Sequence, residues 1–283
     1  MLALVLLALV AGCSAACQQD AEASYDHYVA LGDSYTSGAG LADEVIPTGL
    51  CGQSRLSYPY LVAAELDASL DDASCGGATT QNGAEPQPRA GDQAWPPQLQ
   101  RLGRQTDLVT VGLGYNDFGF YLAALFGCTT VASSDPTGAP CRAGSEAGGD
   151  VDLRTLPPRI GDRVADLLAE VHDRAPDAEV LLVGYPQLVP ADGSCPQLPL
   201  AAGDYAFVRE QLTALDDALR DAAEQADARF VDVMRASEGH DICAGDDAWV
   251  SGSRGGPEQA APYHPFSACQ EAVADLVLAE LRG

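Results

Sequence analysis

Short apolar runs recur along the chain and predict the strands of a sheet. Three of them, Tyr28–Leu31, Leu108–Val111 and Val180–Val183, are each followed by a glycine. A weaker run covers Phe230–Val233, and the stretch before Cys75 suggests a fifth strand. Nearly continuous apolar strands are typical of a parallel sheet that is covered on both faces.

Between these runs, apolar residues recur at steps of three and four, which predicts helices with one buried face. The periodic segments are Tyr58–Leu70, Leu153–Arg174, Tyr205–Ala228 and Phe266–Leu281. Because strands alternate with helices, the sequence predicts a single α/β domain with a doubly wound sheet. Four segments rich in Gly, Pro and Asp are predicted to be long loops: 76–97, 127–152, 186–203 and 240–262.

The start of the chain predicts export. Met1–Val10 is apolar but too short to span a bilayer, and it leads into Val10-Ala11-Gly12-Cys13, which resembles a lipobox. We expect residues 1–16 to be a signal peptide with lipidation at Cys13, residues 17–26 a tether and residues 27–283 the folded domain. Two alternatives stay open: ordinary cleavage near Ala15 or Ala16, giving a freely secreted protein, and a cytosolic protein with a chance apolar start.

The net charge excludes some classes of partner but does not identify a substrate. The formal net charge is −26, and all 15 basic residues are arginines. Such a surface repels nucleic acid and anionic membrane surfaces, so we expect no nucleic-acid partner. Membrane attachment is expected only through a lipidated Cys13, and we expect a monomer.

The nine cysteines fit an oxidising compartment, because no CxxC or HxxxH spacing accompanies them. The short spans Cys51–Cys75 and Cys128–Cys141 favour two disulfides that close loops, which would leave Cys195–Cys243 as the third. Other pairings remain open from sequence alone. Cys269 lies on the apolar pattern of the last helix and is expected to be a buried thiol. The role of Cys17 is open.

The strongest candidate for chemistry follows the first predicted strand. There the chain reads Gly32-Asp33-Ser34, which places a serine at the carboxyl edge of the sheet, where α/β proteins gather their sites. A helix that starts at this serine supplies free backbone N–H groups for an oxyanion. The alternative is that Ser34 only caps the helix.

Two further residues fall at the same edge. Asn116, after the strand Leu108–Val111, has an amide that can donate to an oxyanion, although its turn is equally typical of a helix cap. His264 stands before the last helix, and a serine hydroxyl needs a base with a pKa near neutrality. The alternative for His264 is a residue at the helix entry and nothing more.

Taken together, these residues resemble the GDSL/SGNH hydrolase family, and within it the secreted actinobacterial lipases and esterases. The four matching blocks are Gly32-Asp33-Ser34, Cys75-Gly76-Gly77-Ala78, Gly114-Tyr115-Asn116-Asp117 and His264-Pro265. The resemblance covers about residues 27–281. It implies a three-layer α/β/α domain of flavodoxin-like type around a central, mostly parallel five-stranded sheet, and three sequential disulfides.

The resemblance also implies the site. Ser34 would be the nucleophile, His264 the general base, and the oxyanion hole would consist of the Ser34 and Gly77 N–H groups and the Asn116 amide. No metal or other cofactor is implied. Gly76 stands where this branch usually has a serine, which makes Gly76 a rival donor to Gly77.

The chain departs from the family in the group that orients the histidine. The family commonly has an aspartate three residues before the histidine, and here that residue is Ala261. A main-chain carbonyl from Ala261 or Pro262 is expected to take its place, since a neutral acceptor also fixes the ring. Glu258 is the alternative.

Other residues are expected to have structural roles. Asp33 would accept backbone N–H groups, Asp117 would cap a helix, and His240 would lie in a loop closed by a disulfide. Tyr35, Tyr115 and Phe118 would form the wall of an acyl pocket or simply belong to the core.

The function expected is an exported serine carboxylic ester hydrolase, a lipase or esterase that binds a small acyl-ester or lipid substrate. An O-acetyl esterase or acyltransferase acting on cell-wall glycan or glycolipid is the alternative within enzymes. A surface lipoprotein that binds a ligand without turnover is the alternative of another class.

Overall fold

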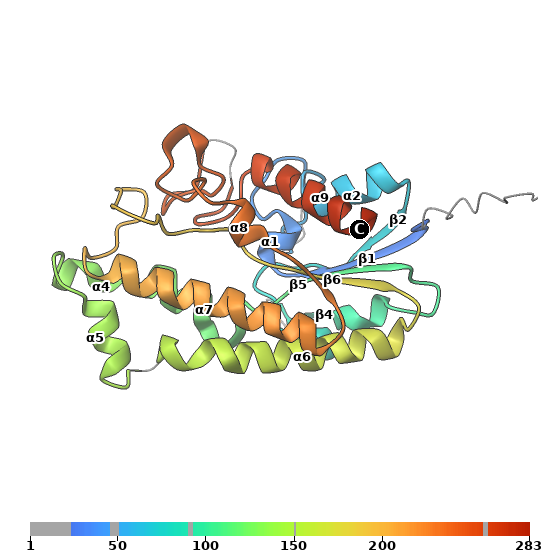
Figure 1. Cartoon of the computed structure of the whole chain (residues 1–283), viewed down its shortest axis with the longest axis horizontal. Helices are drawn as coiled ribbons and strands as arrows, with labels where there is room; N and C mark the ends of the chain where they lie inside the picture. The colour runs from blue at the N-terminus through green and yellow to red at the C-terminus, as the bar shows by residue number, and fades with distance from the viewer. Residues whose placement is uncertain (1–23, 46–50, 90–92, 150, 257–259) are drawn as a thin grey trace, which may run out of the picture.

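The computed structural model describes residues 24–45, 51–89, 93–149, 151–256 and 260–283 (Figure 1). The predicted signal peptide with Cys13, the residue Cys17 and the candidate Glu258 lie outside the described residues. Of the predicted tether, only residues 24–26 are described, and they precede the first strand. In the described part, no helix is long and apolar enough to cross a membrane.

The predicted sheet is confirmed, and all five of its strands are parallel. Their order is β2-β1-β5-β6-β7. The strands are β1 (His27–Gly32), β2 (Ser69–Asp72), β5 (Leu108–Gly112), β6 (Glu179–Val183) and β7 (Arg229–Val231). The sheet grows in one direction from β1 to β2 and in the other from β1 to β5. This reversal places a crevice at the carboxyl ends of β1 and β5, where ligands bind in open α/β sheets.

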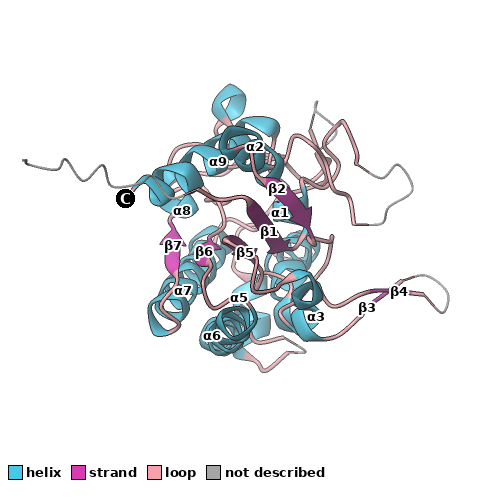
Figure 2. Ribbon diagram, turned by 90° about the vertical axis from the view of Figure 1, so that its right-hand side faces the viewer, coloured by secondary structure: helices cyan, strands magenta, loops and turns pink. Residues whose placement is uncertain are grey.

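Helices cover both faces of the sheet, which gives the expected three layers (Figure 2). One face packs against α6 (Leu156–Arg174) and α7 (Asp204–Gln225), and the other against α2 (Tyr58–Leu66) and α9 (Ser267–Arg282). A separate buried apolar cluster lies between each face of the sheet and the helices that cover it, because the strands carry apolar side chains on both faces.

The predicted boundaries are wrong at three junctions between helix and strand, one of which is the end of α7, predicted at Ala228 and found at Gln225. The helix predicted to reach Leu70 ends at Leu66, because Asp67 adopts a left-handed conformation (φ 52°) and the chain then enters β2. The strand predicted to reach Val233 ends at Val231, because the Asp232 side chain accepts the N–H of Arg235 and starts α8 (Val233–Ala236). A carboxylate that caps a helix outweighs the weak apolar pattern at this point.

Three of the segments predicted to be loops contain short regular elements, and two of these contain more than a single 3-10 turn. Segment 76–97 contains α3 (Gln81–Ala84) and the hairpin of β3 (Gln87–Pro88) and β4 (Ala94–Trp95). Segment 127–152 contains α4 (Cys128–Val131), the 3-10 turn η4 (Ala132–Ser134) and α5 (Pro140–Glu146). The remaining short elements are α1 (Ser34–Ser37), the π-helix η3 (Leu122–Gly127) and the 3-10 turns η1 (Gln98–Arg101), η2 (Asp117–Gly119), η5 (Leu153–Thr155) and η6 (Gly245–Asp247).

The three disulfides are the predicted pairs, Cys51–Cys75, Cys128–Cys141 and Cys195–Cys243. Cys269 is a buried free thiol in α9, also as predicted. The Cys51–Cys75 disulfide lies just beyond the end of β2. It holds the loop that contains Gly77.

Candidate active site

Ser34 lies at the first position of α1, directly beyond the end of β1. A side chain at Gly32 would collide with Thr36 of the following turn, so only glycine allows the chain to bend this sharply from strand to helix. Asp33 caps the helix with its side chain, which accepts the Tyr35 N–H at 2.8 Å. The bend leaves the Ser34 side chain at the carboxyl edge, with 8% of the residue exposed.

Asp33 also receives a hydrogen bond from a second strand end. The hydroxyl of Tyr185, just beyond β6, donates to Asp33 Oδ2 at 2.8 Å and accepts the Tyr115 N–H at 3.2 Å. Burial raises the pKa of Asp33 to about 7. Asp33 is therefore the structural acceptor that the sequence predicted, and through Tyr185 it fixes the turn that contains Ser34 to the turns after β5 and β6.

His264 comes from the far end of the chain and meets Ser34. Its Nε2 lies 2.7 Å from Ser34 Oγ, although 230 residues separate the two. Burial lowers the pKa of His264 below its usual 6.5. The imidazole is therefore neutral near pH 7, the state in which it can accept the serine proton.

The other nitrogen of His264 faces a main-chain carbonyl. Nδ1 lies 2.8 Å from the carbonyl oxygen of Pro262, which can only accept, so Nδ1 carries the proton and Nε2 is free to accept from Ser34. The Ala261 carbonyl is engaged elsewhere, by the Ser251 hydroxyl at 2.5 Å and the His264 N–H at 3.0 Å.

Tyr121 also contacts this pair. Its hydroxyl donates to the Pro262 carbonyl at 3.0 Å and lies 3.3 Å from His264 Nδ1. Burial raises the pKa of Tyr121 far above the usual value, so the group stays a neutral hydroxyl. Sequence reasoning missed this residue, because a tyrosine within the apolar segment Phe118–Leu125 carries no signal that separates it from the core.

Further contacts hold the backbone around His264. Ser251 accepts the His264 N–H at 3.1 Å through its hydroxyl and donates its own N–H to the His264 carbonyl at 2.9 Å. The Tyr35 hydroxyl donates to the carbonyl of Tyr263, a residue with a positive φ of 61°. A left-handed backbone at a tyrosine is unfavourable by itself, so these contacts are needed to maintain the loop.

The candidate oxyanion donors surround the serine. Gly76 donates its N–H to the Cys51 carbonyl at 2.9 Å, whereas the N–H groups of Ser34 and Gly77 have no acceptor among the described residues. Gly77 is exposed and has a φ of 77°, which favours glycine there. The structure therefore favours Gly77 over its rival Gly76 as a group that is free to bind an oxyanion.

Asn116 and Asp117 connect the turn after β5 to the glycine loop. Asn116 Nδ2 donates to the Ala78 carbonyl at 3.0 Å, which leaves its second amide hydrogen available. Asp117 is fully buried and accepts the Thr80 N–H at 2.9 Å, the Thr80 hydroxyl, and Arg163 at 3.3 Å. The sequence predicts that Asp117 caps a helix, but Asn116 is the N-cap of η2 and the Asp117 carboxylate instead holds the loop that contains Gly77.

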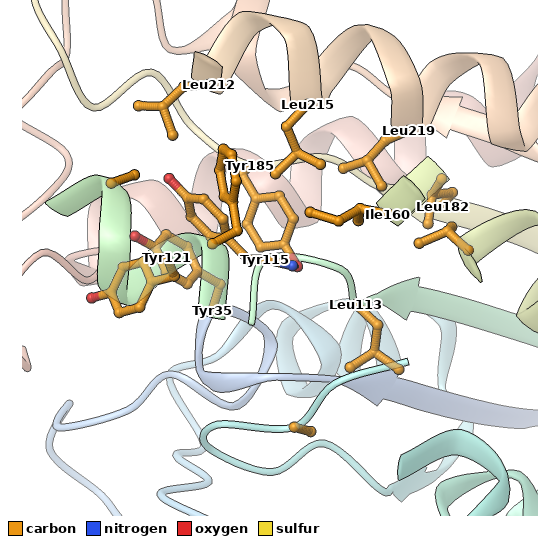
Figure 3. Packing of buried hydrophobic residues seen from close by; sticks show 14 of the residues in the cluster. Tyr35, Leu113, Tyr115, Tyr121, Ile160, Leu182, Tyr185, Leu212, Leu215 and Leu219 are labelled. Carbon is orange, nitrogen blue, oxygen red and sulfur yellow. The ribbon is translucent and has the colours of Figure 1, made fainter. Parts of the chain in front are cut away.

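Four tyrosines of the buried cluster pack together near the carboxyl edge of the sheet (Figure 3). The ring centroids of five contacting pairs lie 4.3–6.1 Å apart, and the rings are those of Tyr35, Tyr115, Tyr121 and Tyr185. Tyr115 is only 2% exposed and belongs to the core, whereas the Tyr35 ring packs 5.0 Å from the His264 ring. Phe118 lies against Arg159 and Arg163, with each guanidinium 4.1 Å from its ring centroid, so the structure does not place it in an acyl pocket.

The remaining histidines lie apart from this pair. His240 stacks on Trp249 with ring centroids 4.2 Å apart, and its Nδ1 contacts the Asp247 carbonyl, which makes it a structural residue. In the described residues, no group of three His, Cys, Asp or Glu side chains could hold a metal ion. The chemistry available at the carboxyl edge is that of a serine, a neutral imidazole and backbone donors, the arrangement of hydrolases that form an acyl-enzyme.

Comparisons with known proteins agree with this class. The model of the GDSL-like lipase/acylhydrolase family matches residues 30–272. Lipase 2 of Streptomyces coelicolor is 38% identical over 245 residues, which cover 84% of this chain and 80% of the lipase.

Solved structures show the same fold. Phospholipase A1 from Streptomyces albidoflavus has a TM-score of 0.72 at 26% identity, covering 90% of this chain and 99% of its own. The extracellular lipase from Streptomyces rimosus has a TM-score of 0.70 at 27% identity, with the same coverage. The chain belongs to the GDSL-like lipase/acylhydrolase family and is an ester hydrolase.

Proposed function

We propose that the protein is an exported serine carboxylic ester hydrolase of the lipase/esterase type, with Ser34 as nucleophile and His264 as general base. The observation that carries the proposal is the 2.7 Å contact between Ser34 Oγ and His264 Nε2, with His264 Nδ1 held by the Pro262 carbonyl. A serine, a base and an orienting acceptor are the parts that nucleophilic catalysis requires.

The reaction proceeds through an acyl-enzyme. His264 accepts the Ser34 proton as Oγ attacks the ester carbonyl, and the oxyanion accepts hydrogen bonds from the Ser34 and Gly77 N–H groups and the Asn116 amide. The C–O bond to the alcohol then breaks, and the imidazolium protonates the leaving oxygen. Water repeats the sequence on the acyl-enzyme, which releases the acid and restores the serine.

The contact of His264 with a backbone carbonyl, and not with a carboxylate, changes how the imidazolium is stabilised. The Pro262 carbonyl fixes the tautomer and the ring of His264, but it offers only a dipole to the imidazolium that forms during attack. The buried carbonyl is close and its position is fixed, so it needs no reorganisation during the reaction. We therefore assign the base function to a Ser34–His264 dyad that the main chain orients.

Export is the second part of the proposal. The three disulfides support an oxidising compartment, and the apolar start of the chain supports a signal peptide in residues 1–16 with acylation of Cys13 and a tether in residues 17–26. Mass spectrometry of the N-terminal peptide of the exported protein distinguishes an acylated Cys13 from simple cleavage near Ala16. An uncleaved, cytosolic chain would contradict export.

The experiment that tests the catalytic proposal is hydrolysis of p-nitrophenyl acetate, butyrate and palmitate by the parent and by Ser34→Ala. We expect turnover in the parent and its loss in Ser34→Ala. Ser37→Ala, a buried serine of the same helix turn, serves as the matched control and should stay active. Full activity of Ser34→Ala would refute the mechanism, and the chain-length profile separates a lipase from a short-chain esterase.

A further inference from the structure

A stretch without charged side chains lies beside the candidate active site. Residues 118–134 contain no Asp, Glu, Lys or Arg, although charged residues make up 20% of the chain. The stretch includes the π-helix η3, the short helix α4 and the turn η4. In a protein with a net charge of −26, this is an unusually long segment without charged side chains.

The same stretch exposes apolar side chains. Leu122 is 60% exposed, Val131 is 40% exposed and Phe126 is 38% exposed. In the part of the chain that the structure describes, these are three of the four exposed large hydrophobic residues, and the fourth is Leu56. Exposed apolar residues scattered singly are ordinary, but three within ten residues of one helical segment form a patch, which points to an interaction site.

The hydroxyl groups of the stretch do not make its exposed surface polar. The hydroxyls of Thr129 and Thr130 donate to the carbonyls of Leu125 and Phe126, and the hydroxyl of Ser134 donates to that of Val131. Each of these hydroxyls is satisfied by the backbone of its own helical segment. These hydroxyls are therefore not free to bind other polar groups, and the exposed Leu, Phe and Val side chains dominate the character of the segment.

This apolar patch of Leu122, Phe126 and Val131 adjoins the catalytic pair directly. Tyr121, which contacts His264, is the residue before Leu122 in the chain. The Phe126 ring packs 5.0 Å from the Tyr263 ring and 5.8 Å from the Tyr121 ring. A surface that binds the apolar patch is therefore brought beside the residues that hold His264.

We propose that the apolar patch of Leu122, Phe126 and Val131 binds the surface of a neutral or zwitterionic lipid aggregate and so presents lipid esters to Ser34. The proposal deepens the proposed function, on which it rests, by naming the surface of this chain that contacts the lipid aggregate. Apolar side chains on an uncharged helical face enter the boundary between headgroups and acyl chains. The net charge of −26 disfavours an anionic lipid surface, so the neutral one is the occupant.

Vesicle binding by the full chain tests the proposal. Every protein carries Ser34→Ala, so that no lipid is hydrolysed, and Cys13→Ser, so that no acyl chain is attached. In this background, the parent is compared with Leu122→Glu/Val131→Glu and with the control Leu56→Glu. Leu122 and Val131 are chosen because they are the most exposed of the three, whereas the Phe126 ring packs against Tyr121 and Tyr263 beside His264. Thermal unfolding of each protein checks that it is folded.

We expect the parent and Leu56→Glu to co-sediment with phosphatidylcholine vesicles, and Leu122→Glu/Val131→Glu to lose about tenfold or more in partitioning. Phosphatidylglycerol added to the vesicles should weaken the binding of the parent. Equal binding by all three proteins, no binding by the parent, or stronger binding to anionic vesicles would overturn the proposal.

An exposed apolar surface can also be an interface between two copies of the chain, and size-exclusion chromatography tests this alternative. If the parent is a dimer that Leu122→Glu/Val131→Glu converts to a monomer, the patch is an interface between two copies and the lipid proposal is wrong. Because vesicle binding is measured in proteins that lack the Ser34 hydroxyl, a failure of the lipid-binding proposal is distinguishable from a failure of the proposed function. The latter appears as absent ester turnover in the protein that retains Ser34.

Discussion

The hydroxyl of Tyr121 donates a 3.0 Å hydrogen bond to the carbonyl oxygen of Pro262. The same carbonyl oxygen accepts the Nδ1–H of His264 at 2.8 Å. A carbonyl oxygen has two lone pairs, so it can accept both groups at once. Tyr121 thus positions the acceptor that stands in for a carboxylate, and the 3.3 Å approach of its oxygen to Nδ1 restricts the ring from the same side.

Tyr121→Phe removes one hydroxyl and keeps the ring. We expect kcat to fall by roughly tenfold with little change in KM, because a less restricted imidazole is less often in line with Ser34, whereas ester binding does not involve this hydroxyl. Steady-state kinetics on p-nitrophenyl butyrate measure both constants.

Tyr205→Phe is the matched control for this substitution. Its hydroxyl donates to the Leu198 carbonyl and accepts the Cys195 N–H, so its hydrogen bonds involve neither His264 nor Pro262. We expect it to lower the melting temperature and leave kcat unchanged. Equal losses of kcat in the two variants would show that Tyr121 acts only through stability.

The burial of His264 predicts the pH dependence of turnover. The base must be neutral to accept the Ser34 proton, and burial lowers the pKa of His264 below 6.5. Hence kcat/KM should rise with pH through an apparent pKa below 6.5 and then reach a plateau. Hydrolysis rates for a soluble ester between about pH 4.5 and 8.5 measure this rising limb of the pH profile. A limb centred above 6.5 would mean that His264 is not the base, or that a carboxylate reaches it.

The sheet and the central residues of the site were accessible from the sequence because each depends on local signals. Apolar runs that end at a glycine mark β1, β5 and β6, and Ser34 and Asn116 follow two of them directly. The carboxyl edge is shared by all parallel strands, so residues after different strands meet there. For His264, whose partner is 230 residues away, the resemblance to the family was needed as well.

The parts that could not be predicted depend on tertiary contacts. Tyr121 and Ser251 position His264 through contacts that bridge 141 and 13 residues, and no periodic pattern marks them. Asp117 has the sequence context of a helix cap, yet it binds Thr80, because the glycine loop folds back against the turn after β5. The left-handed conformation of Asp67, which ends α2 before Leu70, is likewise a backbone choice that the apolar pattern does not show.

Asn116→Ala tests the oxyanion hole. Loss of one such donor typically lowers kcat by a factor of about 100–1,000, or roughly 3 kcal/mol. We expect a drop of this size with KM changed much less, since the amide binds the oxyanion more strongly than the ester carbonyl. Asn116→Asp should be at least as slow, because a carboxylate repels the oxyanion. A loss of kcat below about fivefold in Asn116→Ala would exclude the amide as a donor.

Asp72 is a largely buried residue whose ionised carboxylate destabilises the folded protein at neutral pH. It lies at the end of β2, where Oδ1 accepts the N–H and hydroxyl of Ser74 and Oδ2 has no partner among the described residues. Burial raises the pKa of Asp72 from 3.8 to about 6. A raised carboxyl pKa means that the folded state prefers the protonated form, so the contribution to stability is present below pH 3.8 and is lost as the pH rises to about 6.

Asp72→Asn should therefore stabilise the protein at about pH 8, by roughly 1–2 kcal/mol, and much less at about pH 4. The figure stays below a full conversion of the pKa change, because the side chain keeps some contact with solvent. Asp71→Asn, the adjacent carboxylate that pairs with Arg101 at 3.5 Å with 46% of its side chain exposed, is the control and should change stability little at either pH. Urea unfolding of the three proteins at both pH values measures the difference. A gain of the same size at the two pH values would assign it to packing, because only the ionised carboxylate carries the cost that the amide removes.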